Sequence, residues 1–251
     1  MRIATWNILS GRTPGESTVD ERRFGDAVAT LEADLLGLQE VDRAQQRSGG
    51  LDLTEVAAAA MGATHWMFAP ALAGTPGGWR GATGREGPDE PAYGIAFLSR
   101  HPVLTWDVVP LAPAPTPVPY RWSGRSRPRL VRDEPRVAIV ADVALPDGEL
   151  RVVTTHLSFL PVSNGLQLRH LMARLATRSG RLVLMGDLNM GPRRAERLTG
   201  LGGLGSGPTF PVDVPIRQID HVLARGVRRP GPLGSPVRLP VSDHRALVAD
   251  V

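Results

Sequence analysis

Polar residues that can carry acid–base or metal chemistry end several apolar runs of this sequence. Carboxylate, amide or imidazole groups stand at or near the ends of six apolar segments, at Asn7, Glu40, His156, Asp187 and Asn189, Asp220 and His221, and Asp243 and His244. A single aspartate or asparagine in such a position is usually a turn former or a helix cap. A set of them at the same kind of position is typical of a shared site at a sheet edge. We therefore expect these side chains to meet.

The residue types in this set favour one chemistry. Carboxylate and amide oxygens are hard ligands that suit Mg²⁺, Mn²⁺ or Ca²⁺. The chain has no cysteine and no HExxH sequence, which excludes thiolate zinc sites and cysteine nucleophiles. All 29 basic residues are arginine, which excludes Schiff-base chemistry. Carboxylates and a substrate phosphate together commonly hold a magnesium ion, and histidines beside it can transfer protons or stabilise charge. This set of residues therefore predicts hydrolysis of a phosphate ester.

The apolar runs predict the frame that positions these groups. Eight short runs rich in Val, Ile or Leu are predicted strands, at residues 2–8, 34–41, 94–100, 136–145, 150–159, 181–189, 219–225 and 246–251. Apolar residues at helical spacing predict helices at residues 20–33, 53–61 and 166–177. The pattern predicts an α/β fold with two sheets packed face to face and helices outside. Residues 74–91 and 110–135 are rich in Gly, Pro and charge and are predicted to be irregular.

Length and composition describe an ordinary globular protein. The chain has 251 residues, 42% of them hydrophobic and 22% charged, and we expect a single domain over residues 1–251 that is monomeric. The sequence contains no run of eighteen apolar residues, and its first residues show no secretory pattern, so we expect a cytoplasmic protein. The net charge of +4 indicates a mild preference for anionic partners rather than a protein that wraps nucleic acid.

The ordered motifs of the chain resemble those of a known superfamily. They are WN (6–7), LQEVD (38–42), YGIAFLSR (93–100), EPR (134–136), TTHLS (154–158), GDLN (186–189), IDHVL (219–223) and SDH (242–244). In this order they resemble the endonuclease/exonuclease/phosphatase superfamily, which includes DNases, abasic-site endonucleases, neutral sphingomyelinases, inositol-polyphosphate phosphatases and deadenylases. The resemblance implies a four-layer sandwich of two mixed sheets with helices outside. It also implies a phosphoesterase that depends on Mg²⁺, or on Mn²⁺ or Ca²⁺.

For metal and substrate binding, the resemblance implies roles for five polar residues. Glu40 resembles the metal-binding glutamate, and Asn7 the asparagine that helps to hold the metal site and the phosphate. Asp243 resembles an aspartate that some members use for metal. Asn189 resembles the residue that orients the phosphate. Arg136 supports the site or reaches the phosphate, and the structural alternative is a salt bridge at a strand edge.

For catalysis, the resemblance implies roles for four further residues, and Asn189 also belongs to this catalytic set. Asp187 resembles the aspartate that aligns or activates the attacking water. His244 resembles the histidine that contacts the scissile phosphate and stabilises its charge or acts as a base, and Asp220 the carboxylate paired with it. His156 occupies a position near the leaving-group side. An imidazole held by a carboxylate has a raised pKa and can be cationic beside a phosphate.

The sequence departs from two branches of the superfamily. Abasic-site endonucleases usually have an aspartate two residues after the Asn7-type asparagine, where this chain has Leu9. DNases often carry a glutamate near the start of the strand at 93–100, where this chain has Tyr93. The second departure, at Tyr93, argues against a DNase-like acid pair.

The substrate stays open at this stage. The arginine-rich segment 121–132, with Tyr120 and Trp122, is either a clamp for a polyanion or a solvated loop. Nucleic acid and a small or lipid phosphodiester are equally favoured, although no motif specifies a membrane contact. The alternative to an enzyme is a non-catalytic module that binds phosphate ligands. The completeness of the polar set distinguishes the enzyme from such a module.

Overall fold

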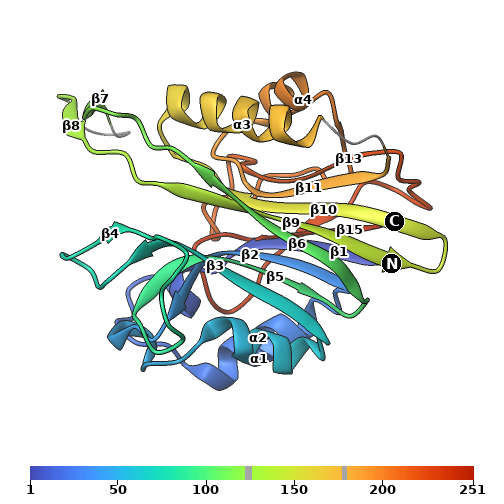
Figure 1. Ribbon diagram of the computed structural model, residues 1–251, viewed down its shortest axis with the longest axis horizontal. Coiled ribbons are helices and arrows are strands. Elements are labelled where there is room, and N and C mark those ends of the chain that lie inside the picture. Colours follow the sequence, from blue (N-terminus) through green and yellow to red (C-terminus); the bar gives the residue numbers. More distant parts are fainter. Residues whose placement is uncertain (122–125, 177–179) are drawn as a thin grey trace.

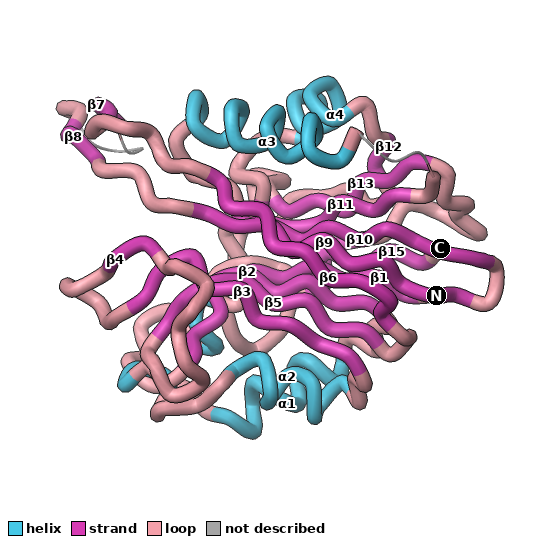
Figure 2. The backbone as a smooth tube through the Cα atoms, viewed as in Figure 1, coloured by secondary structure: helices cyan, strands magenta, loops and turns pink. Residues whose placement is uncertain are grey.

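Two mixed β-sheets pack face to face, and helices cover their outer faces (Figures 1 and 2). A computed structural model of the protein describes residues 1–121, 126–176 and 180–251. Within these ranges the sheets contain seven and six strands, and a separate pair of short strands projects from one end of the molecule. The order of layers is helix, sheet, sheet, helix (Figure 1). The predicted sandwich is therefore confirmed.

The first sheet contains both ends of the described chain. Its strands, in spatial order, are β14 (Ser235–Val237), β15 (Ala246–Asp250), β1 (Arg2–Asn7), β2 (Leu35–Arg43), β5 (Ala92–Ser99), β3 (His65–Ala73) and β4 (Arg80–Gly81). β1 and β2 are parallel, whereas β5 runs antiparallel to both β2 and β3.

The second sheet faces the first across the core. Its strands, in spatial order, are β12 (Gly202–Gly203), β13 (Asp220–Arg225), β11 (Leu182–Asp187), β10 (Gly148–His156), β9 (Arg136–Leu145) and β6 (Val103–Leu111). β10 and β11 are parallel, and the other pairs are antiparallel. β7 (Val118–Tyr120) and β8 (Arg129–Val131) form the projecting pair.

The helices pack on the outer faces of the sheets. α1 (Glu21–Thr30) and α2 (Leu53–Met61) cover the first sheet, and α3 (Pro161–Leu175) and α4 (Pro192–Thr199) cover the second (Figure 1). Short 3₁₀ turns follow β1 at Leu9–Gly11 and β2 at Gln46–Ser48. Asp20 and Asp52 cap α1 and α2 by accepting hydrogen bonds from backbone N–H groups of the first turn. None of the described helices is long and apolar enough to cross a membrane.

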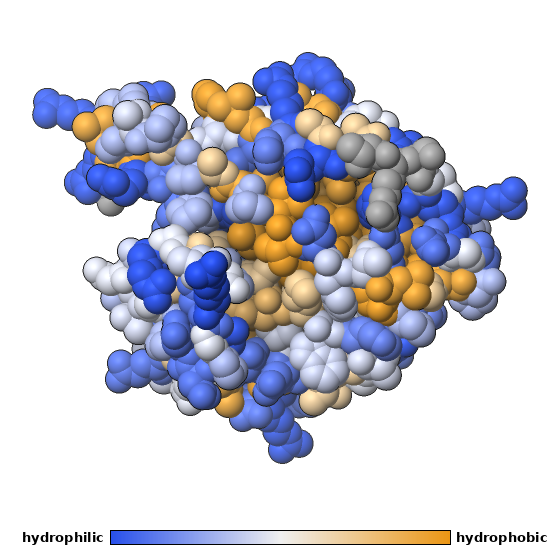
Figure 3. Space-filling model, viewed as in Figure 1, coloured by the Kyte–Doolittle hydropathy of each residue, from blue (hydrophilic) through white to orange (hydrophobic). Residues whose placement is uncertain are grey.

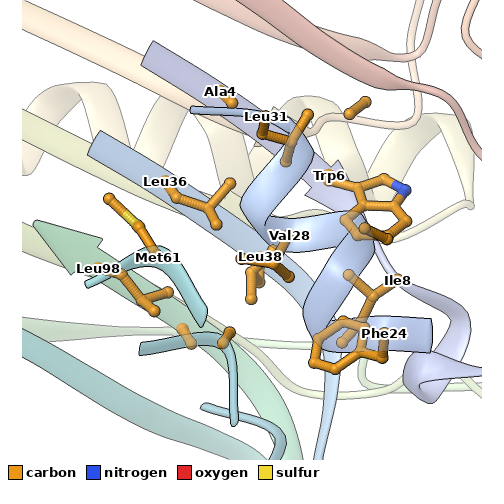
Figure 4. Packing of buried hydrophobic residues seen from close by; sticks show 14 of the residues in the cluster. Ala4, Trp6, Ile8, Phe24, Val28, Leu31, Leu36, Leu38, Met61 and Leu98 are labelled. Carbon is orange, nitrogen blue, oxygen red and sulfur yellow. The ribbon is translucent and has the colours of Figure 1, made fainter. Parts of the chain in front are cut away.

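Apolar side chains fill the space between each pair of layers. One cluster lies between the first sheet and its helices, where Trp6 stacks on Phe24 at a ring distance of 6.2 Å (Figure 4). A second fills the space between the sheets, and a third lies under α3 and α4. The Trp6 indole N–H also donates to the His244 backbone oxygen at 3.3 Å. The core is therefore tied directly to the loop that carries a predicted site residue.

Several predicted boundaries are wrong. α3 begins at Pro161, five residues before the predicted start, because proline fits the first turn of a helix. β11 ends at Asp187 rather than at Asn189, whose φ of +51° takes the chain out of the strand. The segment 110–135 is not irregular throughout, because it contains β7 and β8. Trp122 and Arg125, parts of the predicted clamp, lie outside the described residues.

Candidate active site

The predicted site residues gather at one edge of the two sheets because of how the strands are paired. Asn7 ends β1, and its neighbour in register is Gln39 on parallel β2. In the second sheet His156 ends β10 opposite Asp187 at the end of β11, and Asp187 is opposite Asp220 at the start of antiparallel β13. Parallel strands that end together and an antiparallel strand that starts there bring all these side chains to the same edge.

A β-bulge aims Glu40 at this edge. The register between β2 and β5 shifts between Gln39 and Val41, so Glu40 is the extra residue. Its φ is +59°, a left-handed conformation that costs of order 1–3 kcal/mol for a residue other than glycine. Gln39 and Val41 are buried in the sheet, and Glu40 is half-buried and turned toward Asn7. The bulge takes one carboxylate out of the alternating pattern of the strand.

Backbone strain marks two further site positions. Asn189 and Ser242 also have positive φ, at +51° and +74°. Residues held in such conformations cluster at functional sites, where the surrounding structure must stabilise them. Ser242 is fixed by its side chain, which donates to the Asn7 backbone oxygen at 2.6 Å and accepts from the His244 backbone N–H at 3.0 Å.

The glycine of GDLN lets β11 approach β10 just before Asp187. Gly186 has a φ of +143°, and a Cβ atom there would lie 1.9 Å from the Thr155 carbonyl oxygen. No other residue fits without moving the backbone. Gly186 therefore fixes where Asp187 emerges from the sheet.

Asn7 lies at the centre of the site, between two carboxylates. Its side-chain nitrogen donates to Glu40 Oε1 at 3.1 Å and to Asp187 Oδ2 at 3.2 Å. Burial raises the pKa of Glu40. Burial, together with the charge of Asp220, raises the pKa of Asp187 to about 7. Two carboxylates thus converge on one neutral amide where a positive charge would stabilise both.

His244 and Asp220 form a buried pair beside these carboxylates. His244 Nδ1 lies 2.9 Å from Asp220 Oδ2, and the Thr209 hydroxyl donates to the same oxygen at 2.5 Å. Burial alone would lower the pKa of His244, but the Asp220 carboxylate, together with the charges of Asp187 and Asp243, outweighs burial and raises that pKa to about 10. The imidazole is therefore cationic at neutral pH. Its other nitrogen, Nε2, lies 3.9 Å from Asp187 Oδ2. The Phe210 ring packs against the imidazole, with ring centres 4.8 Å apart.

His156 lies on the other side of Asp187 and differs in charge. Its Nε2 lies 3.6 Å from Asp187 Oδ2 and 3.4 Å from the Asn189 side-chain nitrogen. Burial, followed by the nearby charges of Arg136 and His244, holds the pKa of His156 well below its usual value. Asp187 is thus flanked by one cationic and one neutral imidazole.

Arg136 lies behind His156. One terminal guanidinium nitrogen is 3.4 Å from His156 Nδ1, and the other pairs with Glu134 at 3.3 Å. Its buried Nε has no hydrogen-bond partner among the described residues. The ion pair matches the structural alternative foreseen for this residue, and the contact with His156 also places Arg136 in the site.

The remaining predicted residues, Asn189 and Asp243, lie around this centre. The Asn189 backbone N–H donates to Asp187 Oδ1 at 2.9 Å, and its side chain donates to the Leu157 carbonyl oxygen at 3.0 Å. Asp243 is half-buried, and its carboxylate makes no hydrogen bond or ion pair with the described part of the chain. Its charge nevertheless raises the pKa of both Glu40 and His244, so it lies close to the site.

Two donor sets at this edge could hold a divalent cation. Asp187, Asp220 and His244 offer one ligand atom each within 4.8 Å of one another. A metal there would have to displace the proton that Asp220 stabilises on His244, and the Asp220 oxygen near the imidazole is already shared with Thr209. Asn7, Glu40 and Asp187 fit better, because they provide hard oxygens and two carboxylates that no arginine neutralises directly.

Sequence reasoning missed Thr209, which holds Asp220. Thr209 is fully buried eleven positions before Asp220, in a loop without a recognisable motif. Only the fold brings the two together. His221, in contrast, points away from the site, because its Nε2 contacts the Met190 carbonyl oxygen at 2.8 Å.

Comparison with known proteins agrees with this fold. No curated protein sequence is significantly similar to the chain. Among solved structures, an endonuclease/exonuclease/phosphatase protein from Beutenbergia cavernae is 25% identical, with a TM-score of 0.68 over 99% of this chain and 70% of that one. Sphingomyelinase C from Streptomyces griseocarneus is 16% identical, with a TM-score of 0.67 over 99% and 98%. A mannosyl-6-phosphatase from Bacteroides thetaiotaomicron is 13% identical, with a TM-score of 0.62 over 100% and 98%.

The chain also matches a protein family in sequence. The sequence model of the Endonuclease/Exonuclease/phosphatase family matches residues 4–244, a range that contains every predicted site residue. The chain therefore belongs to the Endonuclease/Exonuclease/phosphatase family, whose members are hydrolases of the phosphoesterase and nuclease type.

Proposed function

We propose that the protein is a divalent-metal-dependent phosphoesterase that hydrolyses a phosphodiester or phosphomonoester by in-line attack of water. One observation carries the proposal. Asn7 joins the carboxylates of Glu40 and Asp187, and the cationic His244 faces Asp187 from the opposite side, held by Asp220. This arrangement combines anionic ligands for a cation with a positive group for a phosphate.

The side chains divide the chemistry among them. Glu40 and the side-chain oxygen of Asn7, after rotation of its amide, would hold the cation, with Asp243 adding negative charge nearby. A divalent cation bound there supplies a Lewis acid that polarises the phosphate and screens its charge. Asp187, once deprotonated, accepts a hydrogen bond from water and aligns it for attack. The second Asp187 oxygen is fixed by the Asn189 backbone N–H, so the acceptor is held in one orientation.

Two groups stabilise the charge that develops on the phosphate. His244 keeps its proton because Asp220 holds it, and it can donate to a phosphate oxygen. The Asn189 side chain lies near His156 and can orient a second oxygen. His156 is neutral at neutral pH and lies where it can exchange a proton with the leaving oxygen. Arg136 contacts the far nitrogen of His156 and adds positive charge behind it.

A non-catalytic module is the weaker alternative. A module that only binds phosphate would not need a carboxylate with a pKa of about 7 beside a histidine with a pKa of about 10. Groups whose pKa values are shifted to suit proton transfer are typical of catalytic sites.

A substrate panel tests the proposal. Release of product is measured from bis(4-nitrophenyl) phosphate, 4-nitrophenyl phosphate, plasmid DNA, a duplex with an abasic site and sphingomyelin, each with Mg²⁺, Mn²⁺, Ca²⁺ or EDTA. We expect metal-dependent turnover of at least one substrate, lost in Asp187→Asn. Absence of turnover with every substrate and metal would refute the proposal, as would an Asp187→Asn variant as active as the native protein.

A further inference from the structure

A groove opens beside the site at the end of the molecule opposite the chain termini. Its volume is about 530 Å³, and it lies between the β3–β4 segment and the chain on both sides of the β7–β8 pair. Figure 3 shows the surface indented between these two projecting parts. The groove is lined by Trp79 and Arg80 on one side, by prolines 113, 115, 117 and 135, and by Arg132 and Glu134 on the other side. Its walls thus combine flat apolar surfaces with arginines.

Trp79, on one side of the groove, belongs to a stack of two aromatic rings and an arginine. Trp79 packs on Tyr93 with ring centres 5.9 Å apart, and the Arg47 guanidinium lies 5.9 Å and 5.5 Å from the two rings. Arg47 is held by the buried Asp42, which it meets through two hydrogen bonds of 2.7 Å. A guanidinium fixed in this way immobilises both rings at little further entropic cost. We call Arg47, Trp79 and Tyr93 the aromatic platform.

Contacts between side chains connect the groove with the candidate active site. Tyr93 lies near Glu40. Burial, and after it the charge of Glu40, raises the pKa of the Tyr93 hydroxyl. Glu134, which lines the groove, pairs with Arg136, and Arg136 contacts His156. The Tyr93 hydroxyl makes no hydrogen bond with any residue that the structure describes, so it is free to donate to a ligand. A substrate whose phosphate sits at Asp187 can therefore extend an organic group over the aromatic platform.

The chemistry of the platform discriminates between organic groups. Aromatic rings with an adjacent arginine favour a planar, uncharged group that stacks, and a nucleobase is the common example. Arg47 already occupies the cation-binding positions over both rings, so a quaternary ammonium would meet a like charge there. Arg132 has no ion-pair partner among the described residues and is exposed, which suits a further phosphate along the groove.

We propose that the aromatic platform binds a nucleobase of a nucleotide phosphodiester and disfavours a quaternary ammonium headgroup. This inference rests on the proposed function, since it assigns the substrate class of the same site. Arg47 and Asp42 act as positioning residues, and Trp79 supplies the main stacking surface.

Three phosphodiesters with matched backbones test the platform. Thymidylyl-(3′→5′)-thymidine is compared with the same dinucleotide in which tetrahydrofuran replaces both base-bearing sugars, and with glycerophosphocholine. Chromatography measures kcat/KM with Mg²⁺ or Mn²⁺ for the native protein, Trp79→Ala, Trp79→Phe and the control Trp66→Ala. Trp66 is an exposed tryptophan of β3 outside the groove, so it controls for loss of an indole.

We expect the native protein to cleave the dithymidine about tenfold or more faster than the base-free dinucleotide, and glycerophosphocholine no faster than the latter. Trp79→Ala should remove most of this preference while changing cleavage of the base-free dinucleotide less than about twofold. Trp79→Phe should restore part of it, and Trp66→Ala should behave as native. Equal cleavage of the two dinucleotides, an equal loss on both in Trp79→Ala, or preference for glycerophosphocholine would overturn the inference.

Calorimetry separates failure of the platform from failure of the proposed function. If neither a diester nor 4-nitrophenyl phosphate is cleaved with any metal, the proposed function is wrong, and binding of dithymidine alone decides about the platform. Binding that weakens about tenfold in Trp79→Ala supports the platform. Absent binding, or binding unchanged by the substitution, refutes it.

Discussion

Replacing Asp220 by asparagine should make activity fall with rising pH above 7, where the activity of the native protein does not fall. Asp220 contacts His244 Nδ1 at 2.9 Å and is the main reason that this buried imidazole is cationic, with a pKa of about 10. Asparagine keeps the shape and one hydrogen bond but removes the charge. Only the weaker charges of Asp187 and Asp243 then oppose burial, so the pKa of His244 should fall toward its ordinary value of 6.5.

The size of the effect follows from the two pKa values. With a pKa of about 10, the native His244 is cationic by about 1000 to 1 at pH 7. With a pKa of 6.5, the cationic fraction is about one quarter at pH 7 and about 3% at pH 8. If the cationic form acts on the phosphate, the variant should lose roughly tenfold in rate for each pH unit above 7, in addition to any loss of orientation.

Rates of 4-nitrophenolate release between pH 6 and 9, at saturating metal, measure this slope. Thr209→Val is the matched control, because it removes a hydrogen bond from the same Asp220 oxygen and leaves His244 in place. It should cost about 1 kcal/mol of stability and keep the native pH profile. NMR titration of the histidine rings checks the pKa directly. An Asp220→Asn variant impaired equally at every pH, or one that recovers as pH rises, would show that His244 does not act as a cation.

Three further predictions concern the frame and the cation. Gly186→Ala should destabilise the protein by several kcal/mol, because its Cβ meets the Thr155 oxygen at 1.9 Å, whereas Gly191→Ala, with no atom within 4 Å, should change the melting temperature little. Manganese diffused into crystals should give an anomalous peak against Glu40, and a peak against Asp220 and His244 would favour the other donor set. The pKa of Asp187 is about 7 and its proton must leave for a cation to bind beside it, so metal affinity should be about tenfold weaker at pH 6 than at pH 8. Calorimetric affinities that do not change with pH would contradict this last expectation.

Much of the site could be predicted because its residues end regular strands. Asn7, His156 and Asp187 each follow an apolar run, and strand pairing carries such residues to a common edge. The sequence model of the family, which matches residues 4–244, confirms the resemblance on which their roles were predicted. The roles themselves stay proposals that the experiments above address.

Other features could not be predicted because tertiary contacts decide them. Nothing in LLGLQEVD shows that Glu40 is the extra residue of a bulge, since glutamate does not favour positive φ. From the sequence, Tyr93 was only a departure from the acid expected at that position. Its contacts with Arg47 and Trp79, which are distant in sequence, appear only in the fold. α4 was missed because its eight residues contain only two apolar side chains, Ala195 and Leu198, so its helical period is weak.

Hydrolysis of bis(4-nitrophenyl) phosphate by metal-stripped protein, titrated with Mg²⁺ or Mn²⁺, tests the central claim most directly. The claim is that Glu40, with Asn7, holds a cation without which Asp187 and His244 cleave no phosphate ester. We expect no activity in EDTA, restoration by the metal, and a loss of roughly 10²–10³-fold in Glu40→Gln but not in Glu55→Gln, at an exposed position of α2. Activity indifferent to EDTA, or a Glu40→Gln variant with native rates, would contradict the claim.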